Sequence, residues 1–525
     1  MGTVLSYCIP IALTFLITKV AERFLWVNKR ADGTQKEAWP PSPSGLPSFT
    51  NAYSLFEKET YHQLTRWHKE LGDFYSVLIG QKRILVANSA ELVQTLLVEK
   101  EQYNSSRLQS DTLERLLTDQ CKTVFTAEFS LYWSRLRRAI FGAIGKATEA
   151  SSRYIQAQTN KLIYGIGEQG DRLTAKALRQ VVHMLAMDTA LALVYGEKHG
   201  QDTAAMATLM QQLESLEARQ TRKYNRMAQF FSFINAWLDI VSLFSLNSET
   251  LTPRNKILET VLPSFVSVYA LRDPTVLNQD KLPLAGSNEQ LNSIVKSLLQ
   301  VEPSKNDPEV SQLSKDEILG NSVHLMLHAY VYLASTLFTL IQRLATEPEF
   351  QERLWQEQDK EALATAFVRE SMRLDPPNHL LGYGARTDYE LDVSGRLYRV
   401  DVDSEIVVNV DAIHQNERYY PHPRQFNPDR FLKSEKKTVS LMTPDATGKK
   451  TARDHLAFGA GRRVCLGSRV SEAFLVSSLL RLNQAYRLEG GDVLQKTEST
   501  TSIWHWTGRT ETKGASIEFI KRDHK

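Results

Sequence analysis

The segment Phe458-Gly459-Ala460-Gly461-Arg462-Arg463-Val464-Cys465-Leu466-Gly467 is the most informative part of the chain. A lone cysteine lies among three glycines, directly before a helical pattern at Ser468 to Leu482. Glycine adopts backbone angles closed to other residues, so the glycines can turn amide N–H groups toward the sulfur and let a flat cofactor approach closely. These donors and the amino end of the helix favour thiolate over thiol. A thiolate bound to iron donates electron density that favours O–O cleavage.

These ten residues resemble the cytochrome P450 haem-binding signature, Phe-x-x-Gly-x-Arg-x-Cys-x-Gly, at every fixed position. In that family the cysteine is the proximal iron ligand, the phenylalanine packs beside the thiolate and the arginine binds a haem propionate. The resemblance implies these roles for Cys465, Phe458 and Arg463, and it places Gly467 in the cofactor site. His455, just upstream, resembles a position of many fungal members. The alternative is a buried cysteine in a glycine-rich turn.

Glu370-Ser371-Met372-Arg373 puts a carboxylate and a guanidinium group on one helical face. Alone it is a common surface pair, but Leu374-Asp375-Pro376-Pro377 ends the helix directly after it. The whole resembles the K-helix region of the family, whose Glu and Arg form a buried network with an arginine ahead of the cysteine. The resemblance implies that Arg430 completes this network and that Arg386 meets a propionate.

Trp133 and Arg137 lie one helical turn apart. By themselves they indicate only an amphipathic helix. The family's C helix has Trp-x-x-x-Arg, both of which reach haem propionates, so the resemblance implies that role for Trp133 and Arg137. Together with Arg135, Arg138 and Arg462, this face is either a docking surface for an acidic reductase or a solvated basic surface.

The composition indicates a globular protein, since 42% of the 525 residues are apolar and 23% are charged. The net charge of +3, from 63 basic and 60 acidic residues, is too small to suggest nucleic acid as a partner. The three cysteines, Cys8, Cys121 and Cys465, are too few and too scattered for a disulfide framework. We therefore expect the bulk of the chain to lie in a reducing compartment.

Residues 1–20 are expected to form an N-terminal membrane anchor, because Met1 to Thr18 has no charged side chain and basic residues follow it. A cleaved signal peptide is the alternative, but the basic n-region is missing. Residues 21–48 are expected to form a juxtamembrane segment and Pro-rich hinge, and residues 49–525 the cytochrome P450 catalytic domain. The positive charges predict that the catalytic domain lies on the cytoplasmic side. With the resemblance to membrane-anchored eukaryotic members of the family, we expect a single-pass protein of the endoplasmic reticulum membrane.

Outside these motifs, Phe74 to Ile79 and Arg83 to Ala87 have the pattern of a β-hairpin. The polar, proline-containing stretch Arg272 to Ser314 is expected to be a long surface connection. Ser314-Lys315-Asp316-Glu317 has the pattern of a capping box and begins a helix that reaches Thr346. At about 1.5 Å per residue this helix would be about 48 Å long, and its apolar residues lie all round it, so it should be buried.

This long helix resembles the family's I helix, which usually has Ala/Gly-Gly-x-Asp/Glu-Thr over the distal face of the haem. Here those five positions are His328, Ala329, Tyr330, Val331 and Tyr332, so Val331 and Tyr332 replace the acid-alcohol pair that relays protons in the family. No register restores the pair, since Ile318 to Thr346 contains no Asp or Glu. His324 and His328 share a helical face, which indicates packed histidines more than a metal pair, because no third ligand is nearby.

Three functions remain open. The first is a haem-thiolate monooxygenase in which Tyr332, water or a substrate hydroxyl supplies the protons. The second is an isomerase or dehydratase that does not activate dioxygen, and the third is a non-catalytic haem-binding protein. The resemblance implies haem b (iron protoporphyrin IX), and NADPH-cytochrome P450 reductase as the partner that passes on electrons from NADPH. It favours a lipophilic substrate of fungal secondary metabolism, such as a polyketide, terpenoid or alkaloid.

The expected fold is therefore mainly α, the helical, haem-enclosing prism of cytochrome P450 with a small β-rich side. The resemblance implies substrate contacts from four regions: Tyr103 to Phe125, Met206 to Leu262, the middle of the long helix, and Pro377 to Gly384.

Overall fold

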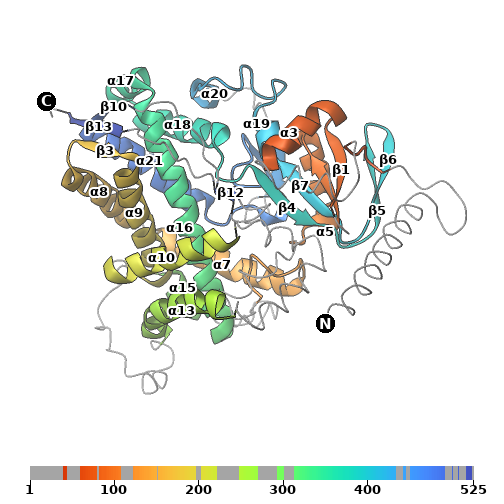
Figure 1. Ribbon diagram of the computed structural model, residues 1–525, viewed down its shortest axis with the longest axis horizontal. Helices are drawn as coiled ribbons and strands as arrows, with labels where there is room; N and C mark the ends of the chain where they lie inside the picture. The colour runs from red at the N-terminus through yellow and green to blue at the C-terminus, as the bar shows by residue number, and fades with distance from the viewer. Residues whose placement is uncertain are drawn as a thin grey trace, which may run out of the picture.

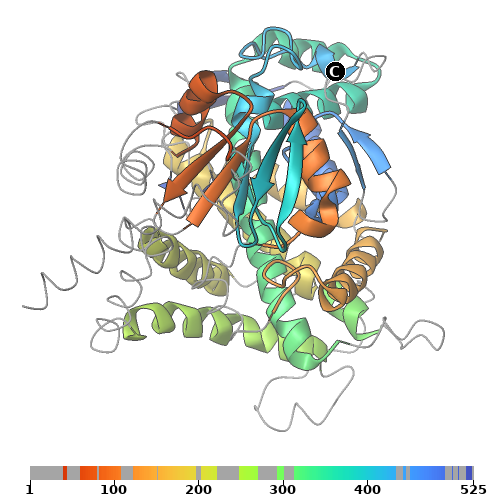
Figure 2. The ribbon, with the colours of Figure 1, turned by 90° about the vertical axis from the view of Figure 1, so that its right-hand side faces the viewer.

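The computed structural model describes residues 39–43, 60–79, 82–107, 122–149, 152–196, 203–220, 247–269, 293–300, 313–432, 441–444, 450–490, 499–500, 506–507 and 516–522. These residues are mainly helical with small sheets, which confirms the expected fold class. Figure 1 shows α16 (Lys315–Ala345) running through the middle of the molecule, with most helices on one side and the largest sheet on the other. Figure 2 shows that sheet in front of α16.

The helical segments follow one another along the chain as α3 Thr60–Leu71, α4 Ala90–Gln94, η1 Thr95–Glu99, α5 Glu101–Asn104, α7 Leu131–Glu149, α8 Ser152–Gln169, α9 Ala175–Tyr195, α10 Thr203–Gln220, α13 Asn247–Tyr269, α15 Ile294–Leu299, α16, α17 Pro348–Gln356, α18 Lys360–Leu374, α19 Val410–His414, α20 Asp429–Leu432, η4 Gly461–Arg463 and α21 Ser468–Ala485. The strands are β1 Phe74–Ile79, β2 Lys82–Ala87, β3 Arg172–Thr174, β4 Leu380–Gly384, β5 Tyr389–Val393, β6 Arg396–Val400, β7 Glu405–Asn409, β8 Leu441–Pro444, β9 Lys450–Arg453, β10 Tyr486–Gly490, β11 Ser499–Thr500, β12 Trp506–Thr507 and β13 Ser516–Lys521.

The predicted hairpin is confirmed as β1 and β2, which pair antiparallel from Phe74 opposite Ala87 to Ile79 opposite Lys82. They belong to a four-stranded sheet in the order β1-β2-β7-β4, in which β2 and β7 are parallel. A three-stranded antiparallel sheet, β10-β13-β3, lies at the other side of the molecule (Figure 1). Three two-stranded pairs complete the described strands.

The long helix is confirmed together with its capping box. The Ser314 side chain accepts a hydrogen bond from the Glu317 N–H, and the Glu317 carboxylate accepts one from the Ser314 N–H. Most of the apolar residues of α16 are buried, and the helix packs against α9, α15, α17, α18 and α21. Both α9 and α16 are long and apolar enough to cross a membrane, but 61% of each apolar window is buried in this core.

The prediction of a surface connection between Arg272 and Ser314 is wrong at residues 293–299. Here Ser293 caps α15, whose residues Ile294, Val295 and Leu298 are buried against the core. The short apolar run was hidden in the sequence by the polar and proline-rich residues around it. Residues 270–292 and 301–312 lie outside the described part of the chain.

The predicted membrane anchor, residues 1–20, lies outside the described residues, as does most of the predicted hinge. Its described part, 39–43, packs on the hairpin. The Pro41 carbonyl accepts a hydrogen bond from Ser76 N at 2.8 Å, and the Arg83 guanidinium lies 3.7 Å from the centre of the Trp39 ring. These five residues therefore belong to the folded body.

Candidate active site

The loop that carries Cys465 is shaped by two glycines. Gly459 and Gly461 have φ angles of +76° and +65°, a region that residues with a Cβ rarely adopt. A Cβ at Gly461 would also lie 2.2 Å from the Leu97 carbonyl oxygen, so this turn requires glycine twice over. Within the loop, Cys465 N donates to the Phe458 carbonyl at 2.9 Å. Gly467 has a φ of −94°, so the expectation that it adopts a glycine-only conformation is wrong.

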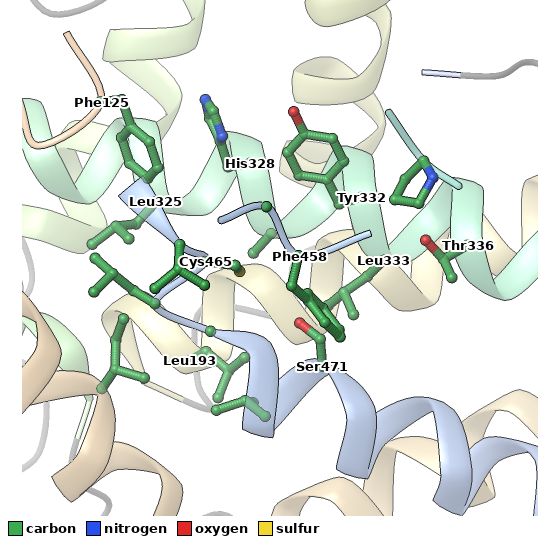
Figure 3. A pocket seen from close by; sticks show the side chains of 18 of the residues that line it. Phe125, Leu193, Leu325, His328, Tyr332, Leu333, Thr336, Phe458, Cys465 and Ser471 are labelled. Atoms are coloured by element: carbon green, nitrogen blue, oxygen red, sulfur yellow. The ribbon is translucent and has the colours of Figure 1, made fainter. Parts of the chain in front are cut away.

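Cys465 is exposed, and it opens into a cavity bounded by α7, α8, α9, α16 and α21. Figure 3 shows Cys465, Phe458 and Ser471 on one side of this cavity and the rings of Phe125, His328 and Tyr332 on the other. Most of the lining is apolar. The amino end of the 18-residue helix α21 lies three residues after Cys465, where its dipole favours a thiolate.

Three guanidinium groups meet at the cavity, those of Arg107, Arg137 and Arg463. The pKa of Arg137 is lowered to about 10, chiefly by burial; Cys465 opposes this shift and the charge of Arg107 adds to it. The pKa of Arg463 also lies well below its usual value because of burial and the charges of Arg107 and Arg137. None of the described residues that line the cavity is Asp or Glu. The arrangement therefore fits a ligand that brings negative charge of its own.

Arg463 is buried and fixed by backbone carbonyls. It donates to Ser105 O at 2.8 Å, Val124 O at 3.0 Å and Ala127 O at 2.6 Å, and its guanidinium lies 4.4 Å from the centre of the Trp133 ring. These bonds tie the cysteine loop to Ser105 and to the segment that carries Val124 and Ala127.

Trp133 also takes part in the contact between the cysteine loop and the segment around Val124. Its indole N–H donates to Val124 O at 3.0 Å, and it does not line the cavity. Arg137, its predicted partner, does line the cavity and donates to Val464 O at 3.0 Å. The structure thus brings only the arginine of this pair to the cavity.

Glu370, Arg373 and Arg430 come together as the resemblance implied. Arg373 binds the Glu370 carboxylate with two nitrogens, at 2.7 Å and 2.8 Å, and both side chains are completely buried. Arg430 Nε lies 3.1 Å from the same carboxylate. A paired, hydrogen-bonded carboxylate of this kind is the arrangement that allows two guanidinium groups to be buried.

His414, which no motif in the sequence indicated, extends this network to the cysteine loop. Leu456 N donates to His414 Nε2 at 2.9 Å, so Nδ1 carries the proton and donates to Arg373 O at 2.9 Å. Burial and the charge of Arg373 lower the pKa of His414 to about 3, which keeps the ring neutral. The ring thereby connects the end of α18 to the residue two positions before Phe458.

Two further predicted cofactor contacts, besides Trp133, lie outside the cavity. Arg386 is exposed and donates to Phe129 O, while Arg107 and Tyr383 line the cavity instead. His455 is buried behind Phe458, with 5.9 Å between the ring centres.

Of the four regions expected to contact substrate, three contribute lining residues. These come from 107–125, 325–336 and 377–383. The described side chains at 206–213 and 255–262 are not among them.

The sequence model of the family described as Cytochrome P450 matches residues 40–505. This chain belongs to the cytochrome P450 family. It is similar to cytochrome P450 monooxygenase 231 of Postia placenta, with 23% identity over 88% of this chain and 84% of the relative. It is also similar to cytochrome P450 monooxygenase virE of Hypocrea virens, with 23% identity over 89% and 81% of the two chains. Cytochrome P450 3A17 of Cavia porcellus is 22% identical over 86% of each chain.

Membership of the cytochrome P450 family implies a haem cofactor, and the residues of the cavity fit one. A flat dianionic group with an iron centre needs an accessible soft ligand, cations for its carboxylates and apolar walls. Exposed Cys465, the three cavity arginines Arg107, Arg137 and Arg463, and the apolar lining provide these. A Cβ at Gly467 would meet nothing closer than the Ser471 hydroxyl at 4.0 Å, so this position leaves space beside Cys465.

Proposed function

We propose that this cytochrome P450 is a haem-thiolate monooxygenase acting on a lipophilic small molecule of fungal secondary metabolism. The observation that carries the proposal is a cysteine open to an apolar cavity that also holds three guanidinium groups and no described carboxylate. The similarity to relatives named monooxygenases supports the same reaction class.

In this proposal Cys465 is the axial ligand of the iron, and Phe458 packs beside its sulfur. Arg107, Arg137 and Arg463 hold the propionates, and Gly467 leaves room for the ring. Haem, when bound, supplies the reductive activation of dioxygen. The chain itself keeps water out of the reaction space through the apolar residues of α9, α16 and α21.

Arg107 rather than Arg386 should be needed to retain haem. Arg107→Leu is expected to speed transfer of haem to apomyoglobin about tenfold, the effect of losing roughly 1.4 kcal/mol of binding. The reason is that Arg107 faces the cavity, whereas the Arg386 side chain is exposed. The matched control is Arg386→Leu, which removes the same charge outside the cavity. Faster haem loss from this control than from Arg107→Leu would show that Arg386, and not Arg107, binds a haem propionate.

We propose that electrons come from NADPH through a separate NADPH-cytochrome P450 reductase. We also propose that the protein is a single-pass protein of the endoplasmic reticulum membrane. Arg138 is exposed for such a partner. Arg135 pairs with Glu317 and Arg462 pairs with Glu101 at 2.5 Å, so part of the positive charge of this face is compensated.

An isomerase or dehydratase is the second candidate, and the distal helix favours it. Residues of α16 that line the cavity include His328, Tyr332 and Thr336, but no Asp or Glu occurs between Ile318 and Ala345. An enzyme of that kind has no need of the acid-alcohol pair of the family, because it does not activate dioxygen.

Isotopically labelled dioxygen separates the two candidates. Purified holoenzyme is incubated with lipophilic polyketides, terpenoids and alkaloids, with and without reductase and NADPH. We expect label in the product only when both reductase and NADPH are present. Conversion without reductant and without label would contradict the monooxygenase and leave haem binding intact. Conversion of any substrate excludes a non-catalytic haem-binding protein.

A further inference from the structure

The distal helix of this protein presents an imidazole to the cavity in the region where the family has its acid-alcohol pair. His328 lines the cavity and is held between aromatic rings. Its ring stacks on Phe125 with 4.1 Å between ring centres and meets Tyr332 edge to face at 5.6 Å. In Figure 3 it lies across the cavity from Cys465. These contacts fix the orientation of the imidazole before any ligand enters.

His324, whose ring contacts the His328 ring, begins a series of hydrogen-bonded side chains that leads toward the surface. The His324 ring meets the His328 ring edge to face, with 5.8 Å between centres. His324 Nδ1 lies 2.7 Å from Thr123 Oγ1, which lies 3.1 Å from Thr126 Oγ1. His324 and Thr123 are completely buried, whereas Thr126 is partly exposed.

This series of side chains is anchored on both of its sides. On α16, Asn321 Oδ1 accepts a hydrogen bond from Val124 N at 2.8 Å, which holds the Thr123 segment against the helix. On the side of the cysteine loop, Arg463 binds the Val124 and Ala127 carbonyls. Hydroxyl and imidazole groups can each donate and accept a proton, so an ordered series of them can conduct one.

We propose that His328 is the distal proton donor of this enzyme, supplied with protons through His324, Thr123 and Thr126. This inference rests on the proposed monooxygenase function and replaces Tyr332 in the role expected from the sequence. In the overall reaction, R–H, O2, NADPH and H+ give R–OH, H2O and NADP+. The two electrons from NADPH reduce one oxygen atom to water, and the other oxygen atom enters a C–H bond of the substrate, which is oxidised by two electrons. The relay delivers protons from solvent to the cavity for that water.

Cyanide tests the base in this cavity without a substrate and without dioxygen. Neutral HCN loses its proton when it binds: the H–C bond breaks, the carbon lone pair goes to the iron and the proton goes to a ring nitrogen of His328. Stopped-flow absorbance measures the association rate constant on resting holoenzyme. We expect His328→Phe to lower it at least about tenfold, the loss of one general base, which typically contributes 10²–10⁴-fold.

Further variants keep the test decisive. His328→Gln, which keeps a polar side chain but cannot take up a proton near neutral pH, should be as slow as His328→Phe and replaces it if that variant fails to fold. Thr123→Val removes the relay hydroxyl at nearly constant volume and should slow association less, because the imidazole remains. Ser335→Ala is the matched control, since its hydroxyl only binds Tyr332 O on the same helix. The carbonyl spectrum of each variant verifies the thiolate ligand.

Cyanide association at the wild-type rate in both His328 variants would overturn the proposal, as would slow association in Tyr332→Phe alone. These outcomes are independent of the labelled-dioxygen experiment. If the His328 variants bind cyanide at the wild-type rate and the product still carries label, the monooxygenase proposal stands and the proposed role of His328 is contradicted. If conversion gives unlabelled product and the His328 variants bind cyanide slowly, only the monooxygenase proposal is contradicted.

Discussion

Cys465→Ala is expected to abolish the thiolate signature in the ferrous carbonyl spectrum and all product formation. The sulfur of Cys465 opens into the cavity beside Phe458 and the amino end of α21. Alanine leaves no soft ligand there, and the electron donation that favours O–O cleavage is lost with the sulfur. The measurement is the carbonyl difference spectrum of purified protein, together with its haem content.

Ser471→Ala is the control for this substitution, since Ser471 lines the same cavity from α21 but has no place in the proposed ligand set. It should keep the thiolate signature. A Cys465→Ala variant that retains the signature, or wild-type protein that takes up no haem, would refute the haem-thiolate assignment.

Glu370→Gln is expected to destabilise the folded protein by about 3–5 kcal/mol, the cost of leaving buried charge without its partner. The carboxylate lies between Arg373 and Arg430, whose side chains are only 0% and 7% exposed. Both guanidinium groups would lose their counter-charge, and Asn427 N would lose a charged acceptor. The midpoint of urea-induced loss of the haem absorbance measures the effect.

Arg353→Gln gives the matched comparison. Arg353 and Asp429 form a pair of the same type at 2.6 Å, but both side chains are more than 40% exposed. Solvent screens such a pair, so its loss should cost less than about 1 kcal/mol. Equal shifts of the two midpoints would contradict the prediction, because the buried ion pair of Glu370 would then contribute no more to stability than the exposed pair of Arg353.

Much of the fold could be predicted because several patterns are local. The capping box at Ser314 and the alternating residues of β1 and β2 depend on neighbours within a few positions. Burial of α15 depends in part on contacts with α7 and α9, which are remote in sequence. A six-residue helix has too few turns to show a periodic signal of its own.

Site residues could be predicted where they lie close together in the sequence. They could not be predicted where the fold brings them in from remote segments. Cys465, Phe458 and Arg463 share one loop, and Glu370 and Arg373 share one helix face. Arg107 comes from a separate segment, and nothing around it in the sequence indicates a cavity. His414 likewise joins the network only through the tertiary fold.

Arg386 and Trp133, which the resemblance implied as haem contacts, do not line the cavity for a different reason. An arginine or tryptophan at a familiar position can bond the protein's own backbone instead of a ligand. Arg386 reaches the Phe129 carbonyl and the Trp133 indole reaches the Val124 carbonyl.

The three carbonyls that hold Arg463 belong to Ser105, Val124 and Ala127, more than 300 positions earlier in the chain. Chimeras made with a homologous enzyme should therefore tolerate crossovers only when the cysteine loop and the stretch that carries Ser105, Val124 and Ala127 come from the same parent. In a hybrid that takes them from different parents, both the cysteine loop and the cavity wall that contains Phe125 are expected to be misaligned. Recombination libraries of this enzyme would be depleted of such hybrids.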